Sequence, residues 1–450
     1  MVNAGTSRAP RAAKRRGRRH DEHSGEHSNE HNRARAWLAR WDWLVRHPFA
    51  LWGVFAFVHV FVALLCIFGP GWPLGDVETV YRSWAVAAES GAYRVGIDTE
   101  FVYPIVAFIP VVLPLAFGPV WYPLAWLGLV TVLDAAAFAC LVGRRDSLRR
   151  VLAAWWWLGF LLLLGPIALA RIDSVTVPLV IMALLWLRTR PLWGTALLTV
   201  ATWVKVWPAA IIAALFVASK HRWQMLAAAA GTSALIVALA LILGSGWNVF
   251  SFVTEQTGRG IQIESPVSLL WLWQAAVGVD GAFVYYDKQI LTYQVTGAGV
   301  DVAAAVMTPL LVLAALAVVL LGWRAARAGA SFSALFPPLV LALVVTFIAF
   351  NKVGSPQFIG WLAAPVILGL VMRGPAWRAP ALLVAVAAGL TQIIYPYLYN
   401  WLLATDPTML VVLSLRNLLE FVILAWAVIE LWTMKSPALN PELSNRTLKE

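Results

Sequence analysis

The sequence predicts an all-α integral membrane protein with about twelve transmembrane helices. Of its 450 residues, 61% are hydrophobic and only 13% are charged, whereas a soluble globular protein is about 45–50% apolar and about 25% charged. The mean hydropathy is +0.75, and apolar runs of roughly the 20 residues that a helix needs to cross a bilayer recur along the chain. Both cysteines, Cys66 and Cys140, lie inside apolar runs, which excludes a disulfide framework.

Residues 1–47 are predicted to form a disordered basic tail on the cytosolic side. They hold eleven Lys or Arg residues and five Asp or Glu residues, which account for +6 of the net charge of +11. No folded nucleic-acid-binding module accompanies this charge, so we expect contact with anionic lipid headgroups and no nucleic-acid partner. No short apolar core precedes a small-residue cleavage site, so we expect no cleaved signal peptide.

The same tail contains four of the seven histidines, and their spacing would align them on one helical face. That face could hold a transition metal, but no Cys or carboxylate cluster completes a site, so we favour a solvated low-complexity segment. The four are His20, His23, His27 and His31.

Basic clusters between the apolar runs orient the chain, because basic loops stay on the cytosolic side of a membrane. Each gap between neighbouring clusters must then contain an even number of crossings, which places both ends of the chain in the cytosol and predicts a multi-pass protein of the cell membrane. A cytosolic C-terminal tail at 434–450 is the last anchor. The clusters are Arg144–Arg150, Arg188–Arg190, Lys220–Arg222, Arg324–Arg327 and Arg373–Arg378.

The gaps accommodate twelve crossings within a membrane domain at 48–433. The apolar stretch 104–118 is expected to be an interfacial or re-entrant helix, since a third crossing there would place Arg144–Arg150 outside. Large outer loops are expected at 69–118 and 244–300. The predicted spans are about 50–68, 120–142, two short spans within 151–187 broken at Gly165-Pro166, two short or broken helices within 191–219 that meet near Lys205, 223–243, 302–322, 332–350, 357–372, 379–396 and 409–433.

Asp76 is the first candidate for chemistry, because it lies at the membrane surface just after the first span. It follows a Gly/Pro-rich turn and precedes a helical pattern over 77–90 that ends at Gly91. One interpretation is that Asp76 is the N-cap of this helix, which is a common role for Asp. The other is a catalytic carboxylate.

Further ionisable residues lie in the outer connections, where a charge at membrane depth costs on the order of 2.5–3.5 kcal/mol unless it meets a polar interior or a ligand. Arg171 and Asp173 are close enough in sequence to neutralise each other, and Arg416 has Glu420 one helical turn further on. Lys205 and Lys352 have no acidic residue near them in sequence, so an anionic ligand such as a lipid phosphate would explain both.

Several segments resemble, in this order, the polytopic glycosyltransferases of the GT-C superfamily. The likeness is closer to the bacterial polyprenyl-phosphate-mannose-dependent alpha-mannosyltransferases of glycosyltransferase family 87, and it covers about residues 50–433. It is carried by GDVETVYRSWAVAAESGAYRV at 75–95, FVYP at 101–104, the segment 170–212 with Lys205-x-x-Pro208, RGIQIES at 259–265, and NKVGSPQF at 351–358.

The resemblance implies a GT-C-like fold, a lipid-phosphate sugar donor, and neither a metal nor a cofactor. In that family an Asp in the first outer loop is the general base, and Asp76 is the matching position. The family usually has Tyr-Pro-Pro where this chain has Tyr103-Pro104-Ile105. We therefore expect transfer of a hexose from a polyprenyl-phosphate sugar to a glycolipid or lipid-linked glycan at the outer face. Mannose is the hexose that the resemblance favours.

This chemistry needs a carboxylate to take the proton of the acceptor hydroxyl and cations beside the departing phosphate. Asp76 is the predicted base. The predicted substrate- or donor-phosphate-binding residues are Lys205, Lys352, Arg259, Arg416, Glu264, Ser265, Gln357, Tyr103, Arg171 and Asp173.

Two other functions fit the same composition. A transporter or flippase of lipid-linked sugars predicts ionisable residues near the bilayer midplane, and no fixed-period repeat in the sequence supports an inverted-repeat architecture. A lipid-linked sugar polymerase or ligase differs from a glycolipid-forming enzyme in the identity of its acceptor. A structural scaffold gives no reason for Lys205 and Lys352, which have no acidic residue near them in sequence.

Overall fold

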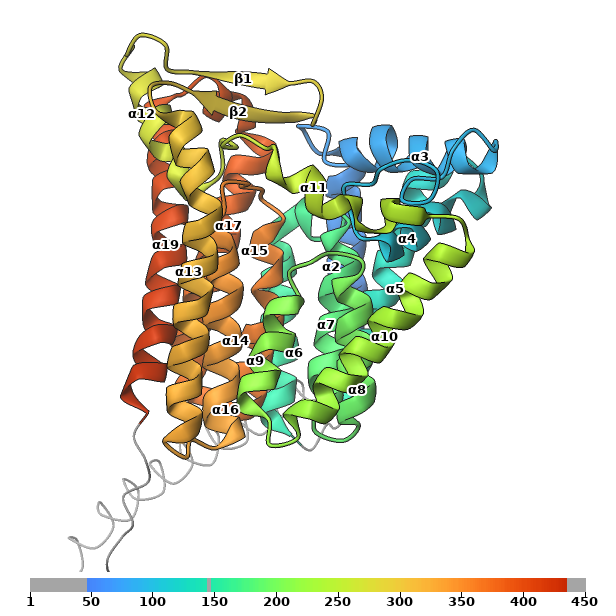
Figure 1. The fold of residues 1–450 in the computed structure, drawn as a ribbon, viewed down its shortest axis with the longest axis vertical. Coiled ribbons are helices and arrows are strands. Elements are labelled where there is room, and N and C mark those ends of the chain that lie inside the picture. The colour runs from blue at the N-terminus through green and yellow to red at the C-terminus, as the bar shows by residue number, and fades with distance from the viewer. Residues whose placement is uncertain (1–46, 144–146, 435–450) are drawn as a thin grey trace, which may run out of the picture. The chain divides into compact units, whose positions relative to one another are not determined.

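The computed structural model describes residues 47–143 and 147–434 (Figure 1). The chain divides into two units, Met1–Gly53 and Val54–Glu450, and the described part of the first unit ends within the first turns of α2. Residues 1–46 of the predicted tail, with its four histidines, the predicted C-terminal tail from 435, and residues 144–146 of the first basic cluster lie outside the described residues.

Twelve helices of ten or more residues lie in the described part of the chain, and they coincide with the apolar runs. They are α2 (Pro48–Phe68), α5 (Tyr122–Val142), α6 (Leu148–Leu164), α7 (Asp173–Trp186), α8 (Pro191–Thr202), α9 (Ala209–Ala218), α10 (Arg222–Ile242), α13 (Val300–Arg327), α14 (Phe332–Ala349), α16 (Ala363–Arg373), α17 (Arg378–Gln392) and α19 (Pro407–Thr433).

Short elements fill the connections between these helices. They are η1 (Asp76–Tyr81), α3 (Arg82–Glu89), η2 (Ile105–Ala107), α4 (Phe108–Val112), η3 (Leu113–Phe117), η4 (Gly165–Ala168), η5 (Gly246–Phe250), α11 (Ser251–Thr257), η6 (Pro266–Ser268), α12 (Leu269–Ala276), α15 (Phe358–Trp361), η7 (Gly374–Trp377), η8 (Ile393–Tyr397) and α18 (Tyr399–Leu403). One antiparallel hairpin joins β1 (Phe283–Asp287) to β2 (Thr292–Thr296), with Tyr286 opposite Tyr293.

The prediction of an all-α polytopic membrane protein is confirmed. Within the described residues, 8 helical segments are long and apolar enough to cross a membrane, and three shorter apolar helices accompany them. One of the eight, Phe358–Tyr397, contains both α16 and α17, which η7 separates. Helices suit the lipid interior because every backbone polar group is satisfied within the segment. The count of twelve crossings stays a prediction.

The helix breaks lie where the sequence predicts them. Gly165, with φ of +64°, ends α6 ahead of Pro166, and the break between α8 and α9 contains Lys205. The stretch 104–118 forms the short elements η2, α4 and η3. Pro and Gly interrupt the helical hydrogen bonds here, which leaves irregular backbone available to carry polar side chains.

Helix α14 is the most enclosed of the described helices that are long and apolar enough to cross a membrane. All but a few of its side chains are buried, because it packs against α19, α13, α9 and α16. A second group forms where α7 packs against α8, α5 and α16. The breaks near Lys205 and at 350–357 lie at the ends of these two groups.

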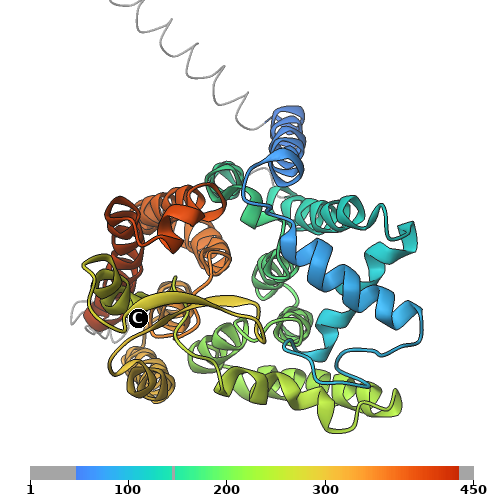
Figure 2. The same cartoon turned by 90° about the horizontal axis from the view of Figure 1, so that it is seen from above.

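The connections of the second unit fall into two sets at opposite ends of its helices (Figure 1), and Figure 2 shows the helices seen from above. At the basic end, Arg324 donates to the Trp432 carbonyl at 2.6 Å, and Arg373 pairs with Glu430 at 2.7 Å. At the other end, called the loop-rich end here, lie η1, α3, α11, α12 and the hairpin. The loop-rich end comprises the connections 69–121, 165–172, 203–208, 243–299, 350–357 and 393–406.

Candidate active site

The carboxylate of Asp76 forms an ion pair with Arg171 at the loop-rich end. Asp76 Oδ2 lies 3.2 Å from Arg171 Nε, and the Asp76 side chain is 45% exposed while that of Arg171 is 7% exposed. The pair therefore consists of an accessible carboxylate and a buried guanidinium.

The interpretation of Asp76 as an N-cap is wrong. Gly75 occupies the N-cap position and is itself helical, and the amide of Glu78 already donates to the carbonyl of Leu74 at 2.9 Å. Helical hydrogen bonding thus begins before Asp76, so the Glu78 amide, which a cap at Asp76 could bind, is already bonded. The carboxylate turns to Arg171 instead.

Arg171 is fixed on several sides. Its Nη1 donates to the carbonyls of Pro73 at 2.6 Å and Ala170 at 2.8 Å, and its Nη2 donates to the Tyr395 hydroxyl at 2.7 Å. Gly71, with φ of +80°, makes this possible: a Cβ there would overlap the carbonyl of Pro396, so only glycine lets the 69–75 turn approach Tyr395. The guanidinium, held by these hydrogen bonds, orients the Asp76 carboxylate.

Asp173 does not neutralise Arg171, and that prediction is wrong. Asp173 is the first residue of α7, where its Oδ1 accepts a hydrogen bond from Trp361 Nε1 at 2.6 Å, and its Oδ2 lies 3.4 Å from Lys205 Nζ. Arg171 lies in the connection before α7, whereas Asp173 begins the helix, and their side chains reach different partners. Lys205, in the break between α8 and α9, therefore has a carboxylate partner at the start of α7. The prediction that Lys205 is unpaired is also wrong.

Tyr103 joins these two ion pairs. The Lys205 ammonium lies 4.6 Å from the centroid of the Tyr103 ring, a cation–π contact. Tyr103 also stands edge-on to Tyr81, with ring centroids 6.4 Å apart. The Tyr81 hydroxyl accepts from the amide of Ile172 at 3.2 Å. Burial first, and then Tyr103 and Asp76, raise the pKa of Tyr81 well above its ordinary value, so its hydroxyl stays protonated.

Two further cations, Arg259 and Lys352, belong to the site: Arg259 lies within electrostatic reach of Tyr103, and Lys352 within reach of Arg259. Arg259 Nε donates to the carbonyl of Glu255 at 3.2 Å, and burial lowers the pKa of Arg259, which Tyr103 partly offsets. Burial and the neighbouring charge of Arg259 lower the pKa of Lys352. Like charges disfavour each other's ionised state, so a bound anion would stabilise both residues.

The loops that carry these cations are packed backbone to backbone. The amide of Gln262 donates to the carbonyl of Lys352 at 3.0 Å, and a Cβ on Gly354 would overlap the backbone of Glu264 and Ser265. Glycine at this position therefore lets RGIQIES and NKVGSPQF lie against each other, although 85 residues lie between the two segments in the chain.

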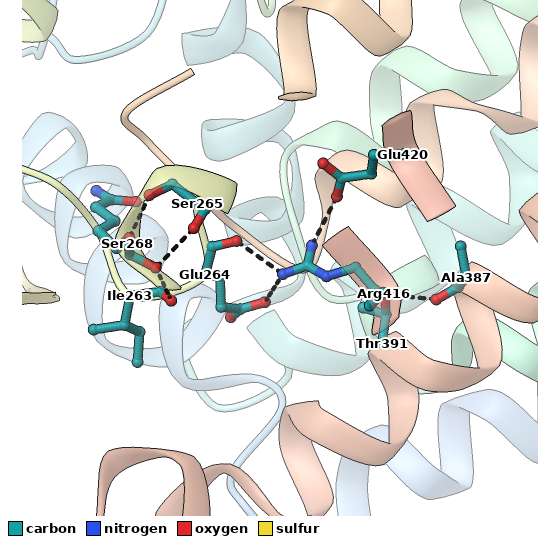
Figure 3. A network of polar contacts seen from close by, with 9 residues as sticks. Ile263, Glu264, Ser265, Ser268, Ala387, Thr391, Arg416 and Glu420 are labelled. Carbon is teal, nitrogen blue, oxygen red and sulfur yellow. Dashed lines mark hydrogen bonds and ion pairs between the residues drawn. The ribbon is translucent and has the colours of Figure 1, made fainter. Parts of the chain in front are cut away.

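Behind this contact lies a buried charge network centred on Arg416 (Figure 3). Its side chain is 1% exposed, and its nitrogens lie 3.3 Å from Glu420 Oε1 and 3.4 Å from Glu264 Oε2. Arg416 also donates to the carbonyl of Glu264 at 2.9 Å. The predicted pairing of Arg416 with Glu420 is confirmed, and Glu264 is a second acidic partner.

The serines of the same loop bond to its own backbone. Ser265 Oγ donates to the carbonyl of Gln262 at 2.7 Å, and Ser268 Oγ lies 2.7 Å from the carbonyls of Ile263 and Ser265. Burial, opposed by Arg416 and Arg171, raises the pKa of Glu264 to about 7. These groups hold the loop that presents Arg259.

Gln357 lies on the inner side of the site. A cavity of about 20 Å³ is lined by Gln357, Asp173, Ser174 and Asp134, among apolar side chains of α6, α7 and α16. Asp134 Oδ2 lies 3.0 Å from His59 Nε2, a buried pair between α5 and α2. Sequence reasoning did not single out this pair, because neither residue stands beside a motif.

The structure thus brings together Asp76, Arg171, Asp173, Lys205, Tyr103, Arg259 and Lys352 at the loop-rich end. Arg416, Glu264 and Ser265 form the supporting network, and Gln357 lies beside Asp173. Sequence reasoning missed Tyr81, Tyr395 and Trp361. An aromatic residue in a membrane protein is usually an interfacial anchor, so these three carried no separate signal. Within the described residues, no group of three or more His, Cys, Asp or Glu side chains is arranged to hold a metal.

Residues 101–285 match the sequence model of glycosyltransferase family 87. The matched segment includes Tyr103, Arg171, Asp173 and Lys205 and ends within the hairpin. Comparisons with curated proteins and with solved structures gave no match. Together with the apolar helices, the family match supports a membrane glycosyltransferase.

Proposed function

We propose that the protein transfers a hexose, most of all mannose, from a polyprenyl-phosphate sugar to a hydroxyl of a glycolipid or lipid-linked glycan at the outer face of the cell membrane. The observation that carries this proposal is the exposed carboxylate of Asp76, held by buried Arg171 beside a group of cations. The match of 101–285 to a glycosyltransferase family supports sugar transfer.

The reaction is a single displacement in which Asp76 is the general base. The acceptor oxygen attacks the anomeric carbon, the bond from that carbon to the phosphate oxygen breaks, and its electron pair leaves with the polyprenyl phosphate. The acceptor proton passes to Asp76, and the anomeric configuration inverts. Arg171 keeps the carboxylate in one orientation, which preserves the short proton-transfer distance that general-base catalysis requires.

Arg259 and Lys352 are the proposed phosphate ligands. Developing negative charge on the leaving phosphate is stabilised by cations fixed in place before the reaction, and the packed loops at Gln262 and Gly354 fix both residues. Lys205 contributes from its place over the Tyr103 ring, where Asp173 holds its ammonium. Arg416 is committed to two carboxylates and supports this arrangement from behind.

The distribution of basic residues supports the outer-face assignment. The connections at the basic end carry a series of Lys and Arg residues, which stay on the cytosolic side, so the loop-rich end with Asp76 faces outward. This end is also where a lipid-phosphate donor presents its sugar. The basic-end residues are Arg188, Arg190, Lys220, Arg222, Arg324, Arg327, Arg373 and Arg378.

Alanine at Arg259 or Lys352 is expected to raise the KM for the donor about 10- to 100-fold, because a hydrogen bond to a charged group contributes about 1.5–3 kcal/mol.

The donor KM of the wild-type protein should also rise as the pH is raised, and the rise should begin below 10.5, the pKa of free lysine. The lowered pKa of Lys352 causes this side chain to lose its proton at a lower pH than free lysine does. Lys352→Arg should remove that rise.

The matched control for these variants is Arg94→Ala. Arg94 is an exposed cation of the first large loop that pairs with Asp98 at 2.9 Å, and its loss should leave the donor KM unchanged. An equal effect of all three substitutions would show only a general dependence on positive charge and would contradict the assignment.

The function itself is tested by sugar transfer in membranes that contain the protein. The membranes are supplied with radiolabelled polyprenyl-phosphate mannose or with labelled nucleotide sugar, and the lipid products are resolved by chromatography. We expect labelled glycolipid from the lipid-linked donor alone. Movement of intact donor across the bilayer without a new product would instead indicate a flippase.

A further inference from the structure

Four of the ten tyrosines form a continuous row that leads from the hairpin to Arg171. The ring centroids of Tyr286 and Tyr293 are 4.9 Å apart, those of Tyr293 and Tyr399 are 6.0 Å apart, and those of Tyr399 and Tyr395 are 5.0 Å apart. The row ends at the Tyr395 hydroxyl, to which Arg171 donates at 2.7 Å.

The row is supported on one side and accessible on the other. Tyr293, Tyr395 and Tyr399 pack against a buried apolar cluster that includes Ile263 and Ile394, yet all three remain half-buried. Tyr286, at the far end, is 44% exposed. A supported aromatic face that stays accessible, with hydroxyl groups at its edge, is suited to a ligand with both apolar and polar surfaces.

Backbone contacts hold the hairpin in place. The amide of Val295 donates to the carbonyl of Ile261 at 3.0 Å, and the amide of Ile263 donates to the carbonyl of Tyr293 at 3.3 Å. The hairpin therefore extends the loop that also presents Arg259. Burial, Tyr293 and the charge of Asp76 raise the pKa of Tyr286, which indicates that the tip of the row lies within electrostatic reach of the candidate base.

We infer that the row of Tyr286, Tyr293, Tyr399 and Tyr395 is the acceptor subsite and that it binds a pyranose ring of the acceptor glycan. This inference rests on the proposed function. A pyranose has an apolar face of C–H groups that stacks on aromatic rings, and its rim of hydroxyls bonds to phenol groups. On the donor side, Lys205 lies over the ring of Tyr103 and Arg259 lies within electrostatic reach of it, whereas the row reaches Arg171 through Tyr395. Asp76 can thus contact an acceptor hydroxyl held by the row while the donor occupies the Tyr103 side.

The test uses octyl α-D-mannopyranoside, below its micelle-forming concentration, with the full-length protein in lipid nanodiscs. Saturation-transfer NMR reports which ligand protons touch the protein, and a transfer assay with polyprenyl-phosphate mannose gives the KM for the glycoside. We expect the sugar-ring protons to receive saturation in the wild type. Tyr286→Ala should reduce that signal and raise the glycoside KM about 10-fold without changing the donor KM, and Tyr286→Phe should retain most of the binding.

The matched control is Tyr285→Ala. Tyr285 is the preceding residue on the same strand, is 39% exposed, and faces Gln294 on the opposite side of the hairpin. Unchanged ring-proton saturation in Tyr286→Ala, or saturation of only the octyl chain in the wild type, would overturn the subsite. The NMR signal does not require catalysis, so ring binding without any transfer would contradict the proposed function and the acceptor role, and it would leave the row standing only as a sugar-binding site.

Discussion

Asp76→Asn is expected to lower sugar transfer about 10²- to 10⁴-fold, which corresponds to about 3–5 kcal/mol of activation barrier. Asn has the size of Asp but cannot take a proton, so the acceptor hydroxyl would have to attack while still protonated. The protein should still fold and bind donor, because Asp76 is half-exposed and its partner Arg171 keeps its bonds to Pro73, Ala170 and Tyr395. The measurements are turnover and donor binding on the same preparation.

Asp98→Asn is the control for this substitution. Asp98 belongs to the same large loop and pairs with Arg94, but both side chains are about two-fifths exposed, and exposed ion pairs contribute little. Near-normal turnover by well-folded Asp76→Asn would remove Asp76 from the chemistry. Equal losses of turnover in both variants would show that turnover depends on the loop as a whole and not on the Asp76 carboxylate.

Arg416→Leu is expected to destabilise the protein by about 3–5 kcal/mol, because it leaves Glu264 and Glu420 buried without their shared cation. Both carboxylates lie within 3.4 Å of the guanidinium. The effect should appear as a lower midpoint of thermal unfolding in detergent. Adding Glu264→Gln and Glu420→Gln to Arg416→Leu should recover much of the lost stability, since no buried charge then remains.

Arg373→Leu is the comparison at the basic end. Arg373 pairs with Glu430, but the two side chains are 25% and 33% exposed, so its loss should cost no more than about 1 kcal/mol. A similar fall in the unfolding midpoint for Arg373→Leu and Arg416→Leu would contradict the view that the buried network supports the site.

The positions of the long helices could be predicted from sequence because the bilayer imposes their length and composition. Gly165-Pro166 and the segment around Lys205 break the apolar runs, and the structure ends helices there. The hairpin was harder to predict. Its residues lie inside a stretch interpreted only as a large outer loop, although the β-branched and aromatic residues of 283–296 are typical of paired strands.

The pairings of the charged residues could not be predicted in the same way. Local spacing suggested Arg171 with Asp173, but the observed partner of Arg171 is Asp76, 95 residues earlier in the chain. Such contacts depend on how helices pack, which a pattern within one segment does not contain. Arg416 and Glu420 are the exception, since an interval of four residues in a helix fixes their proximity.

The most direct test of Asp76 as the base of a single displacement is the anomeric configuration of the product. The wild-type protein would be given polyprenyl-phosphate mannose of known configuration, and the linkage in the purified glycolipid would be determined by NMR. If one carboxylate activates the acceptor in a single displacement, the product has the configuration opposite to that of the donor. A product that retains the donor configuration would require two displacements and a covalent intermediate, and it would contradict the account.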